Sequence, residues 1–407
     1  MVGYPHTVAF PGETPSCMSG GRSSKVRPRK LLVVAQRNGL MINFLSIDTL
    51  EPVLQVDSTS EQRARELPKP AYDGQDNGPL AQGMDNYAIG STEKFYKSYG
   101  ISLNLYVIEN AKVLFGTGVD GVVIDKDSNV IAEPSCFHDR EFLDRRMNEL
   151  TTEPEGTHLK TAFVACDAAW NNYYHWICYG LAKAKLAEPF LPQDAVNIVP
   201  LYEQRGTGQK MAYKESVYHE SISLFDFKHP VLKFSPGVVK VDRLYFIWTQ
   251  PRLPPDILIS PAFKNIFNQL SNRLEVDESL PSKIFLSRRQ AGSRRFDPSF
   301  EEQLVHLTSQ FGFTTVVLED LSFKEQITLF RNATHIISPH GAAFTNLLFK
   351  PDRARVLEIN HDIDGQGFLR ACFYLMAEEN GHEYMYIDST VDDVLLRLPE
   401  CLNRFVS

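Results

Sequence analysis

The pattern of apolar and polar residues is most regular in the last third of the chain, where short apolar runs alternate with longer stretches that are apolar on one face. The short runs are rich in β-branched residues and suit buried strands, whereas the longer stretches suit amphipathic helices. Strands are predicted at 283–286, 313–318, 334–338, 354–359 and 384–387, and helices at the segments that begin at 261, 298, 323, 342 and about 367, with one more closing the chain. This alternation predicts right-handed βαβ units and a parallel sheet that is covered on both faces.

The ends of two of these helices carry their own signals. Asp297 followed by Pro298 is a typical N-cap and first helical residue, and Gly312 is placed to end the same helix. Ser322 and Glu325 have the spacing of a capping box. These residues predict two helix starts independently of the hydrophobic pattern.

The first part of the chain is less regular. Strands are predicted at 30–35, 161–167, 197–202 and 240–248, a hairpin at 121–132, helices at about 173–188 and 210–225, and a long polar excursion at 58–86. Residues 1–29, rich in Gly, Ser, Pro and Arg, are predicted to be a disordered tail. The proline-rich segment 251–255 predicts a linker. We therefore expect an N-terminal α/β domain at 30–255 and a C-terminal domain at 256–407, and we leave open that the last helix packs back on the N-terminal domain.

Composition and charge narrow the class of protein. With 43% hydrophobic and 23% charged residues, the chain has the composition of a soluble globular protein. A formal net charge of −8 argues against a nucleic-acid partner. The 6 cysteines show no CxxC spacing, which favours a reducing, cytoplasmic location. The sequence has no apolar run of about 18 residues, so we expect no membrane-spanning segment.

The candidate chemistry centres on a Pro-His-Gly turn at 339–341, which joins a predicted strand to an apolar segment at 342–349. Gly341 lets the backbone approach a ligand closely, and the free N–H groups that begin with Ala342 carry the positive end of a helix dipole. This arrangement suits an anion, most simply a phosphate; an ordinary strand-to-helix turn is the alternative. His340 is expected either to hydrogen-bond a phosphate oxygen or to cap the turn.

Residues on both sides of this turn extend the hypothesis to a nucleotide diphosphate. Thr345 and Asn346 either donate to phosphate or ribose, or bond within the first helical turn. Upstream, Arg288 and Arg294 follow a predicted strand, and guanidinium groups suit phosphate oxygens. Downstream, Glu358 interrupts an apolar strand near its end, where a carboxylate can accept both hydroxyls of a ribose.

The order of these motifs resembles that of glycosyltransferase family 61. The likeness runs through residues 172–176, 287–289 with Arg294, 321–327, 339–346 and 357–359, and it covers roughly residues 100–390. The sequence departs from the family pattern at two places. Ala343-Phe344 stands where Gly-Leu is usual, and Asp297-Pro298 stands where Asn-Glu is expected.

The resemblance implies a soluble protein of the family's bacterial or viral type. It implies an α/β, GT-B-like fold with two Rossmann-like domains that face each other across a cleft. The implied reaction is an inverting, metal-independent transfer of a sugar from a nucleotide-diphosphate donor, with UDP as the nucleotide, to a hydroxyl of a glycan or glycoconjugate. No divalent metal or other cofactor is expected. The closest match to an Asp-x-Asp metal motif, residues 362–364, lies in a Gly-flanked loop, and metal binding there is the lesser alternative.

The acceptor hydroxyl requires a base, which should come from the N-terminal domain because it must reach across the cleft. His175 and Asp167 are the candidates. Asn172 and Trp176 lie beside His175 and suit the binding of an acceptor sugar by hydrogen bonds and stacking. The alternative is a His-Trp pair packed inside an amphipathic helix.

Two other functions remain open from the sequence. A non-catalytic protein that binds nucleotide-sugars or glycans would keep the phosphate site and lack the base. An unrelated α/β enzyme, such as a dehydrogenase, is disfavoured because no Gly-x-Gly-x-x-Gly motif follows the first strand.

Overall fold

The computed structural model describes residues 43–45, 50, 53–59, 69–70, 101–116, 118–131, 157–167, 169–202, 211–250, 261–291, 296–360, 372–388 and 394–407. All of them belong to one compact unit, Leu32–Ser407. The predicted tail at 1–29, strand at 30–35 and linker at 251–255 lie outside the described residues, as do Arg294 and the segment 362–364.

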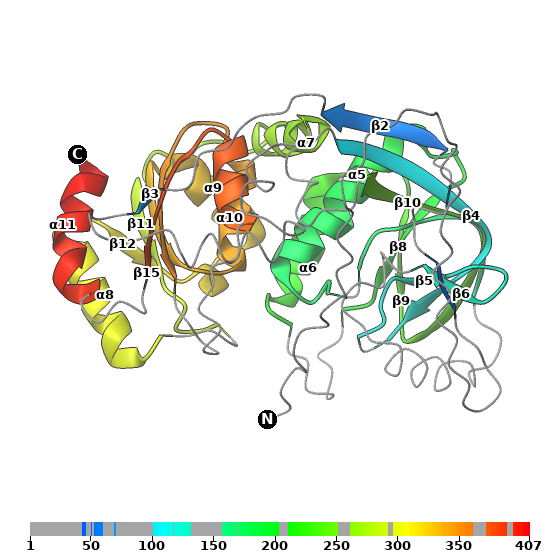
Figure 1. Cartoon of the computed structure of the whole chain (residues 1–407), viewed down its shortest axis with the longest axis horizontal. Helices are drawn as coiled ribbons and strands as arrows, with labels where there is room; N and C mark the ends of the chain where they lie inside the picture. The colour runs from blue at the N-terminus through cyan, green and yellow to red at the C-terminus, as the bar shows by residue number, and fades with distance from the viewer. Residues whose placement is uncertain are drawn as a thin grey trace, which may run out of the picture. The chain divides into compact units, whose positions relative to one another are not determined.

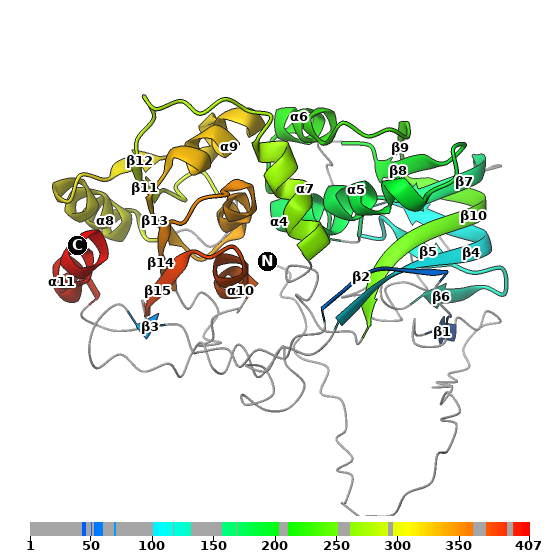
Figure 2. The same ribbon diagram turned by 90° about the horizontal axis from the view of Figure 1, so that it is seen from above.

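The described residues form a mixed α/β fold with two sheets, shown in Figures 1 and 2. The first sheet has nine strands in the order β1-β6-β5-β4-β10-β7-β8-β9, with β2 paired to β4. These strands are β1 Asn43–Leu45, β2 Leu54–Thr59, β4 Ile101–Phe115, β5 Val122–Ile124, β6 Asn129–Ile131, β7 His158–Val164, β8 Val196–Pro200, β9 Val231–Phe234 and β10 Gly237–Gln250. Strands β10, β7, β8 and β9 pair in parallel, whereas β4 runs antiparallel to β10.

Helical segments connect the parallel strands of the first sheet. The chain is helical without a break through α4 Tyr173–His175, the π-helix η2 Trp176–Ala182, α5 Lys183–Ala187 and the 3₁₀ turn η3 Glu188–Phe190, and α6 Glu215–Phe225 follows later. The predicted helix at 173–188 and the predicted hairpin at 121–132 are thereby confirmed. The helix predicted at 210–225 begins later than expected, at Glu215. The described residues before it, 211–214, are extended or bent.

The second sheet has six strands in the order β12-β11-β13-β14-β15-β3, all parallel. They are β3 Lys69–Pro70, β11 Lys283–Leu286, β12 Thr314–Val316, β13 His335–Pro339, β14 Arg355–Asn360 and β15 Glu383–Asp388. The parallel sheet predicted from the alternation of segments is therefore present. Its edge strand β3 was not foreseen, since it comes from the polar excursion at 58–86.

The helices beside the second sheet are α7 Pro261–Ser271, α8 Pro298–Gln310, η5 Leu318–Asp320, α9 Phe323–Asn332, η6 Ala342–Phe349, α10 Cys372–Glu379 and α11 Val394–Val406. Both predicted helix starts are confirmed: Asp297 accepts from the Ser299 N–H at 2.9 Å, and Ser322 with Glu325 forms a complete capping box. The segment after Gly341 is a 3₁₀ helix, η6, rather than an α-helix.

Helices cover both faces of the second sheet. Figures 1 and 2 show α8 and α11 on one face and α9 and α10 on the other. On the α11 side, Leu402 and Phe405 are buried together with Leu304 of α8 and Ile337 of the sheet. The last helix thus buries its apolar face within the C-terminal half of the chain.

Aromatic side chains connect α7 to the elements on either side of it. Phe267 of α7 lies edge-on to Phe225 of α6 and to Phe349 of η6, with ring centroids 6.3 and 4.9 Å apart. Phe323 of α9 also packs edge-on to Phe349. Burying one such ring contributes roughly 1.5–3 kcal/mol, so this row holds η6 firmly in place.

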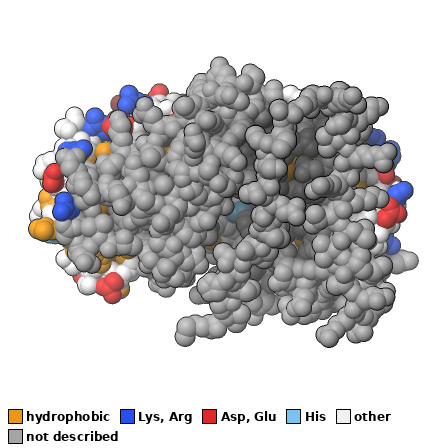
Figure 3. Space-filling view, in the orientation of Figure 1, with side chains coloured by type: hydrophobic (Ala, Val, Ile, Leu, Met, Phe, Trp, Pro, Cys, Tyr) orange, Lys and Arg blue, Asp and Glu red, His pale blue; other side chains and the backbone are white. Residues whose placement is uncertain are grey.

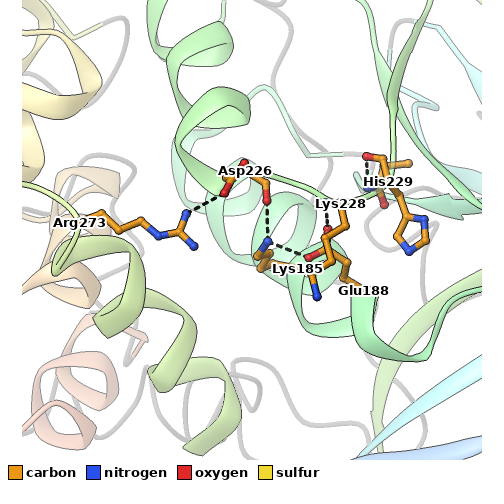
Figure 4. A network of polar contacts seen from close by, with 7 residues as sticks. Lys185, Glu188, Asp226, Lys228, His229 and Arg273 are labelled. Carbon is orange, nitrogen blue, oxygen red and sulfur yellow. Dashed lines mark hydrogen bonds and ion pairs between the residues drawn. The ribbon is translucent and has the colours of Figure 1, made fainter. Parts of the chain in front are cut away.

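A polar network lies near the end of α6 (Figure 4). Lys185 donates to the Glu188 carboxylate at 2.8 Å and to the Asp226 carbonyl at 2.7 Å, and Asp226 also faces Arg273 at 3.4 Å. The backbone N–H of Lys228 donates to the second oxygen of Glu188. The buried Glu188 thus fixes the loop after α6, whereas the exposed Arg273–Asp226 pair contributes only about 0–1 kcal/mol.

Where described atoms are visible in Figure 3, Lys or Arg and Asp or Glu side chains lie beside one another. Among the residues that the structure describes, no helix combines the length and the hydrophobicity needed to span a membrane.

Candidate active site

A histidine–carboxylate pair lies at the carboxyl end of β7. Asp167 follows this strand, and His175 ends the single turn of α4. The Nδ1 atom of His175 lies 2.7 Å from Oδ2 of Asp167, and the two side chains are 17% and 5% exposed. A carboxylate can only accept, so Nδ1 carries the proton in this assignment and Nε2 is left with its lone pair. The two residues proposed as bases are thus brought together as one unit.

The protonation state of Asp167 supports this assignment. Burial by itself would raise the pKa of Asp167. The charge that His175 carries when it is protonated, its hydrogen bond to Asp167 and the charge of Lys183 together outweigh burial, so the pKa of Asp167 lies below the ordinary carboxyl value. Asp167 therefore remains ionised near neutral pH and holds the imidazole in one orientation.

Local structure fixes the pair from both sides. Asn172 is the N-cap of α4, where its Oδ1 accepts from the Tyr174 N–H at 2.9 Å. The second oxygen of Asp167 accepts from the Ala169 N–H at 3.0 Å. Asn172 starts the helix that carries His175, and its predicted contact with an acceptor sugar stays a prediction.

The π-helix η2 begins immediately after His175. A π-turn inserts one extra residue into a helix and occurs often at functional sites. Within η2, Gly180 packs on the end of β7 so closely that a Cβ atom there would lie 2.9 Å from the Ala165 carbonyl oxygen. This glycine lets the helix lie directly on the strand end that leads to Asp167.

Trp176 is fully buried. Its ring stacks on Tyr218 at 4.8 Å, and its Nε1–H donates to the Ser221 hydroxyl at 2.9 Å. This placement matches the packed His-Trp alternative rather than an acceptor contact, because a side chain with no exposed surface has no face to offer a sugar.

The second half of the site lies at the carboxyl edge of the parallel sheet. His340 follows β13, and its backbone N–H donates to the Ile359 carbonyl at 3.0 Å. Its Nδ1 atom bonds to Glu358 of β14. The other oxygen of Glu358 accepts from the Tyr384 hydroxyl at 2.5 Å, and Glu358 is 0% exposed. Glu358, predicted to bind a ribose, therefore lies beneath His340 with both oxygens bonded.

Arg288 lies directly against Gly341. Its Nη1 donates to the His340 carbonyl at 2.7 Å, and a Cβ atom on Gly341 would lie 1.6 Å from the same Nη1. The φ angle of Gly341 is 166°, which is extended, so the glycine is needed for space rather than for its conformation. Sequence reasoning expected a ligand to approach Gly341, and the structure places a guanidinium group there.

A buried glutamate that sequence reasoning missed holds Arg288. Oε1 of Glu301, in the first turn of α8, accepts from the Ser287 hydroxyl and from the Arg288 N–H at 3.1 Å. Glu301 was not among the candidate residues drawn from the sequence. Its position in the first turn of a capped helix that follows the strand–arginine segment is the signal that could have revealed this role.

Backbone N–H groups and a guanidinium group, which carry partial and full positive charge, lie together at the start of η6. The first N–H groups of a helix have no acceptor within it, and here they include those of Ala342 and Ala343, since the first intrahelical bond runs from Phe344 to Gly341. These groups and the Arg288 guanidinium lie at the same turn. An anion would offset this local positive charge, so the geometry suits a phosphate group.

Thr345 and Asn346 are both 0% exposed. The Tyr173 hydroxyl donates to Oδ1 of Asn346 at 2.7 Å, and Nδ2 of Asn346 lies 3.4 Å from Oε1 of Gln326. Asn346 is thus committed to a buried chain from α4 to α9. The Thr345 hydroxyl has no hydrogen-bond partner among the described residues.

One aromatic residue lies beside both halves of the site. The ring of Phe373, in α10, is 5.1 Å from that of His340 and 6.0 Å from that of Tyr174. Tyr174 directly precedes His175, so the two turns share a neighbour. Within the described ranges, no three His, Cys, Asp or Glu side chains converge in a way that could hold a metal ion.

Comparison with known families shows that this chain contains a glycosyltransferase domain. The model of the family described as Glycosyltransferase 61 matches residues 173–357, slightly less than half of the chain. The chain therefore contains a glycosyltransferase 61 domain, and the resemblance drawn from its motifs is confirmed. The matched segment includes His175, Arg288 and His340, begins after Asp167 and ends one residue before Glu358. A search of curated proteins returned no match.

Proposed function

We propose that this glycosyltransferase is inverting and metal-independent, and that it moves a sugar from a nucleotide-diphosphate donor, a UDP-sugar, to a hydroxyl of a glycan or glycoconjugate. The observation that carries the proposal is the His175–Asp167 pair, whose 2.7 Å bond at Nδ1 leaves Nε2 as a base. A base is what transfer with inversion requires, because the acceptor hydroxyl must lose its proton as it attacks.

In the proposed reaction, the acceptor oxygen attacks the anomeric carbon from the face opposite the nucleotide. His175 accepts the hydroxyl proton at Nε2 while Asp167 stabilises the imidazolium that forms. The bond from the anomeric carbon to the phosphate oxygen breaks, and its electron pair leaves with the nucleoside diphosphate. Because attack and departure occur on opposite faces, the anomeric configuration inverts.

The charge that leaves with the diphosphate needs stabilisation by fixed positive groups. We assign this role to Arg288 and to the backbone N–H groups after Gly341, beginning with Ala342. A contact between the fully buried Thr345 and the donor remains a prediction. Arg294 remains a predicted contact. Asn346 is assigned to positioning, since both ends of its amide have partners.

The two sheets are proposed to form the two Rossmann-like domains of a GT-B arrangement, with a boundary near residue 255. Support comes from the position of the two half-sites: each follows the carboxyl end of parallel strands, where ligands bind in such sheets. A cytoplasmic location likewise stays a proposal.

A donor screen followed by product analysis tests this function. Purified protein is mixed with UDP, GDP, CMP and TDP sugars, and thermal unfolding is followed, because a ligand that binds only the native state raises the melting temperature. A UDP-sugar is expected to give the largest shift. Proton NMR of the product should then show inverted anomeric configuration, and turnover should persist in EDTA. Retention of configuration, or loss of turnover in EDTA, would contradict the proposal.

A further inference from the structure

We propose that Glu358 and Tyr384 form a buried support that fixes the His340 imidazole, so that His340 donates a hydrogen bond from Nε2 to the departing diphosphate. The inference rests on the nucleotide-diphosphate donor proposed above. It changes the predicted role of Glu358 from a ribose contact to a positioning residue, and it adds Tyr384, which no sequence motif indicated.

The bonding of Glu358 fixes the direction of each hydrogen bond. A fully buried carboxylate is costly unless its oxygens receive hydrogen bonds. Here the Tyr384 hydroxyl donates to Oε2 at 2.5 Å, and Oε1 lies against Nδ1 of His340. A carboxylate accepts at both oxygens, so Nδ1 must be the protonated nitrogen. The remaining nitrogen of the ring, Nε2, has no partner among the described residues and is the atom that can reach a ligand.

His340 is held through its main chain as well as its side chain. Its N–H donates to Ile359 at 3.0 Å, and its carbonyl accepts from Arg288 at 2.7 Å. Arg288 is the same residue that lies against Gly341. The imidazole is therefore attached to the turn at residues 339–341, which we call the phosphate turn. Any group that this turn binds lies near the ring. Phe373 packs on the ring at 5.1 Å and supplies an apolar wall.

A diphosphate at this turn would make Nε2 a donor. With Glu358 at Nδ1 and the diphosphate at Nε2, each ring nitrogen would face an oxygen that can only accept a hydrogen bond. One N–H is then directed at Glu358 and the other at the phosphate. As the bond between the anomeric carbon and oxygen breaks, its electron pair becomes charge on that phosphate. The Nε2–H bond strengthens with this charge, while the acceptor proton moves to His175.

A ribose contact by Glu358 would require a different arrangement. Both oxygens are already bonded, and the side chain has no exposed surface. Because the side chain is fully buried, a ribose hydroxyl could reach Glu358 only if the side chains that cover it moved. The positioning role needs no such change.

The test compares Glu358→Gln and Tyr384→Phe with wild type in the full chain. Affinity for UDP and for 2′-deoxy-UDP is measured by calorimetry, and kcat and KM are measured with the UDP-sugar that stabilises the protein most. Both variants should lower kcat by about 10-fold or more, which is the effect of losing one well-placed hydrogen bond. The preference for UDP over 2′-deoxy-UDP should not change. Glu383→Gln, on the same strand as Tyr384 but partly exposed, is the matched control and should behave as wild type.

Combining variants gives a second readout. Because the proposed support acts only through His340, Glu358→Gln should add nothing in a His340→Ala background. A further loss in that background, or loss of the discrimination between UDP and 2′-deoxy-UDP, would show that Glu358 contacts the donor directly. Should Glu358→Gln fail to fold, Tyr384→Phe, which keeps the ring, carries the test alone. Unchanged kcat in folded variants overturns the inference, whereas failure of wild type to bind UDP overturns the proposed donor.

Discussion

At the scale of single residues, carboxylates set the orientation of the reactive groups. Asp167 holds His175, Glu358 holds His340, and Glu301 holds the loop of Arg288. Each carboxylate is buried, and Asp167 and Glu358 bond to the two histidine rings that are proposed to face the substrate. The residues that would touch ligand are thus fixed by acceptors that lie behind them.

This arrangement predicts the behaviour of Asp167→Asn. The asparagine amide can donate to Nδ1, which would move the ring proton to Nε2 and remove the base. We expect kcat to fall by about 10²- to 10⁴-fold, as in His175→Ala, with little change in donor KM. Steady-state kinetics of both variants measure this effect, and His219→Ala, at an exposed position on α6, is the control. Near-normal kcat in Asp167→Asn would contradict the assignment.

At the scale of elements, short helices connect the two halves of the site. Tyr173 lies on the same turn as His175, and its hydroxyl donates to Asn346 of η6, which lies close to Gln326 of α9. Gln326 in turn donates to the Leu318 carbonyl at 3.0 Å. This buried chain sets the position of the His175 turn relative to the phosphate turn.

Tyr173→Phe removes one hydroxyl from this chain. The variant leaves Oδ1 of Asn346 buried without its donor, which should lower the free energy of unfolding by about 1–3 kcal/mol. Because α4 also carries His175, kcat should fall while UDP affinity stays close to that of wild type. Urea denaturation and calorimetry separate the two effects. A loss of stability with unchanged kcat would mean that the chain is structural only.

The sequence predicted helix starts correctly where they depend on residues close together in the chain. The capping box at Ser322 and the N-cap at Asp297 depend on residues a few positions apart, and both are present. The 3₁₀ form of η6, the π-helix after His175 and the partners of Glu358 depend on contacts with distant segments. Tyr384 and Phe373, for example, reach the site from strands and helices that follow it in the chain, and no short motif marks them.

At the scale of the whole molecule, stability should respond to pH through His382. This buried side chain accepts from the Ala354 N–H at 3.3 Å and lies 3.4 Å from the Leu347 carbonyl. Desolvation lowers its pKa from 6.5 to about 4. The folded state therefore binds a proton less readily than the unfolded state. The stabilisation by neutral His382 is complete above pH 6.5 and is lost as the pH falls toward 4.

The difference between wild type and His382→Asn measures this effect. In wild type, the free energy of unfolding should fall by about 3 kcal/mol across that window, following the size of the shift. The variant lacks the group that titrates, so its own decline should be smaller by that amount. Urea denaturation at a series of pH values gives both curves. Parallel curves would show that His382 does not couple protonation to folding.

The sheets show how far the organisation of the chain could be read from the sequence. The parallel second sheet followed from regular alternation of apolar segments, and five of its six strands were placed. Strand β3 was missed because a two-residue edge strand has no periodicity to detect. The histidine–carboxylate pair was foreseen only as two separate candidates, since the contact depends on how α4 lies on the end of β7.

The central claim is that Arg288 and the turn at Gly341 bind the diphosphate of the donor. Titration of UDP into wild type and Arg288→Ala by calorimetry tests it most directly, with Arg353→Ala, at an exposed position, as the control. We predict that Arg288→Ala weakens UDP binding by about 10- to 100-fold, as expected for a lost charge-assisted hydrogen bond, while the protein still folds. Equal affinity for UDP in wild type and folded Arg288→Ala would contradict the account.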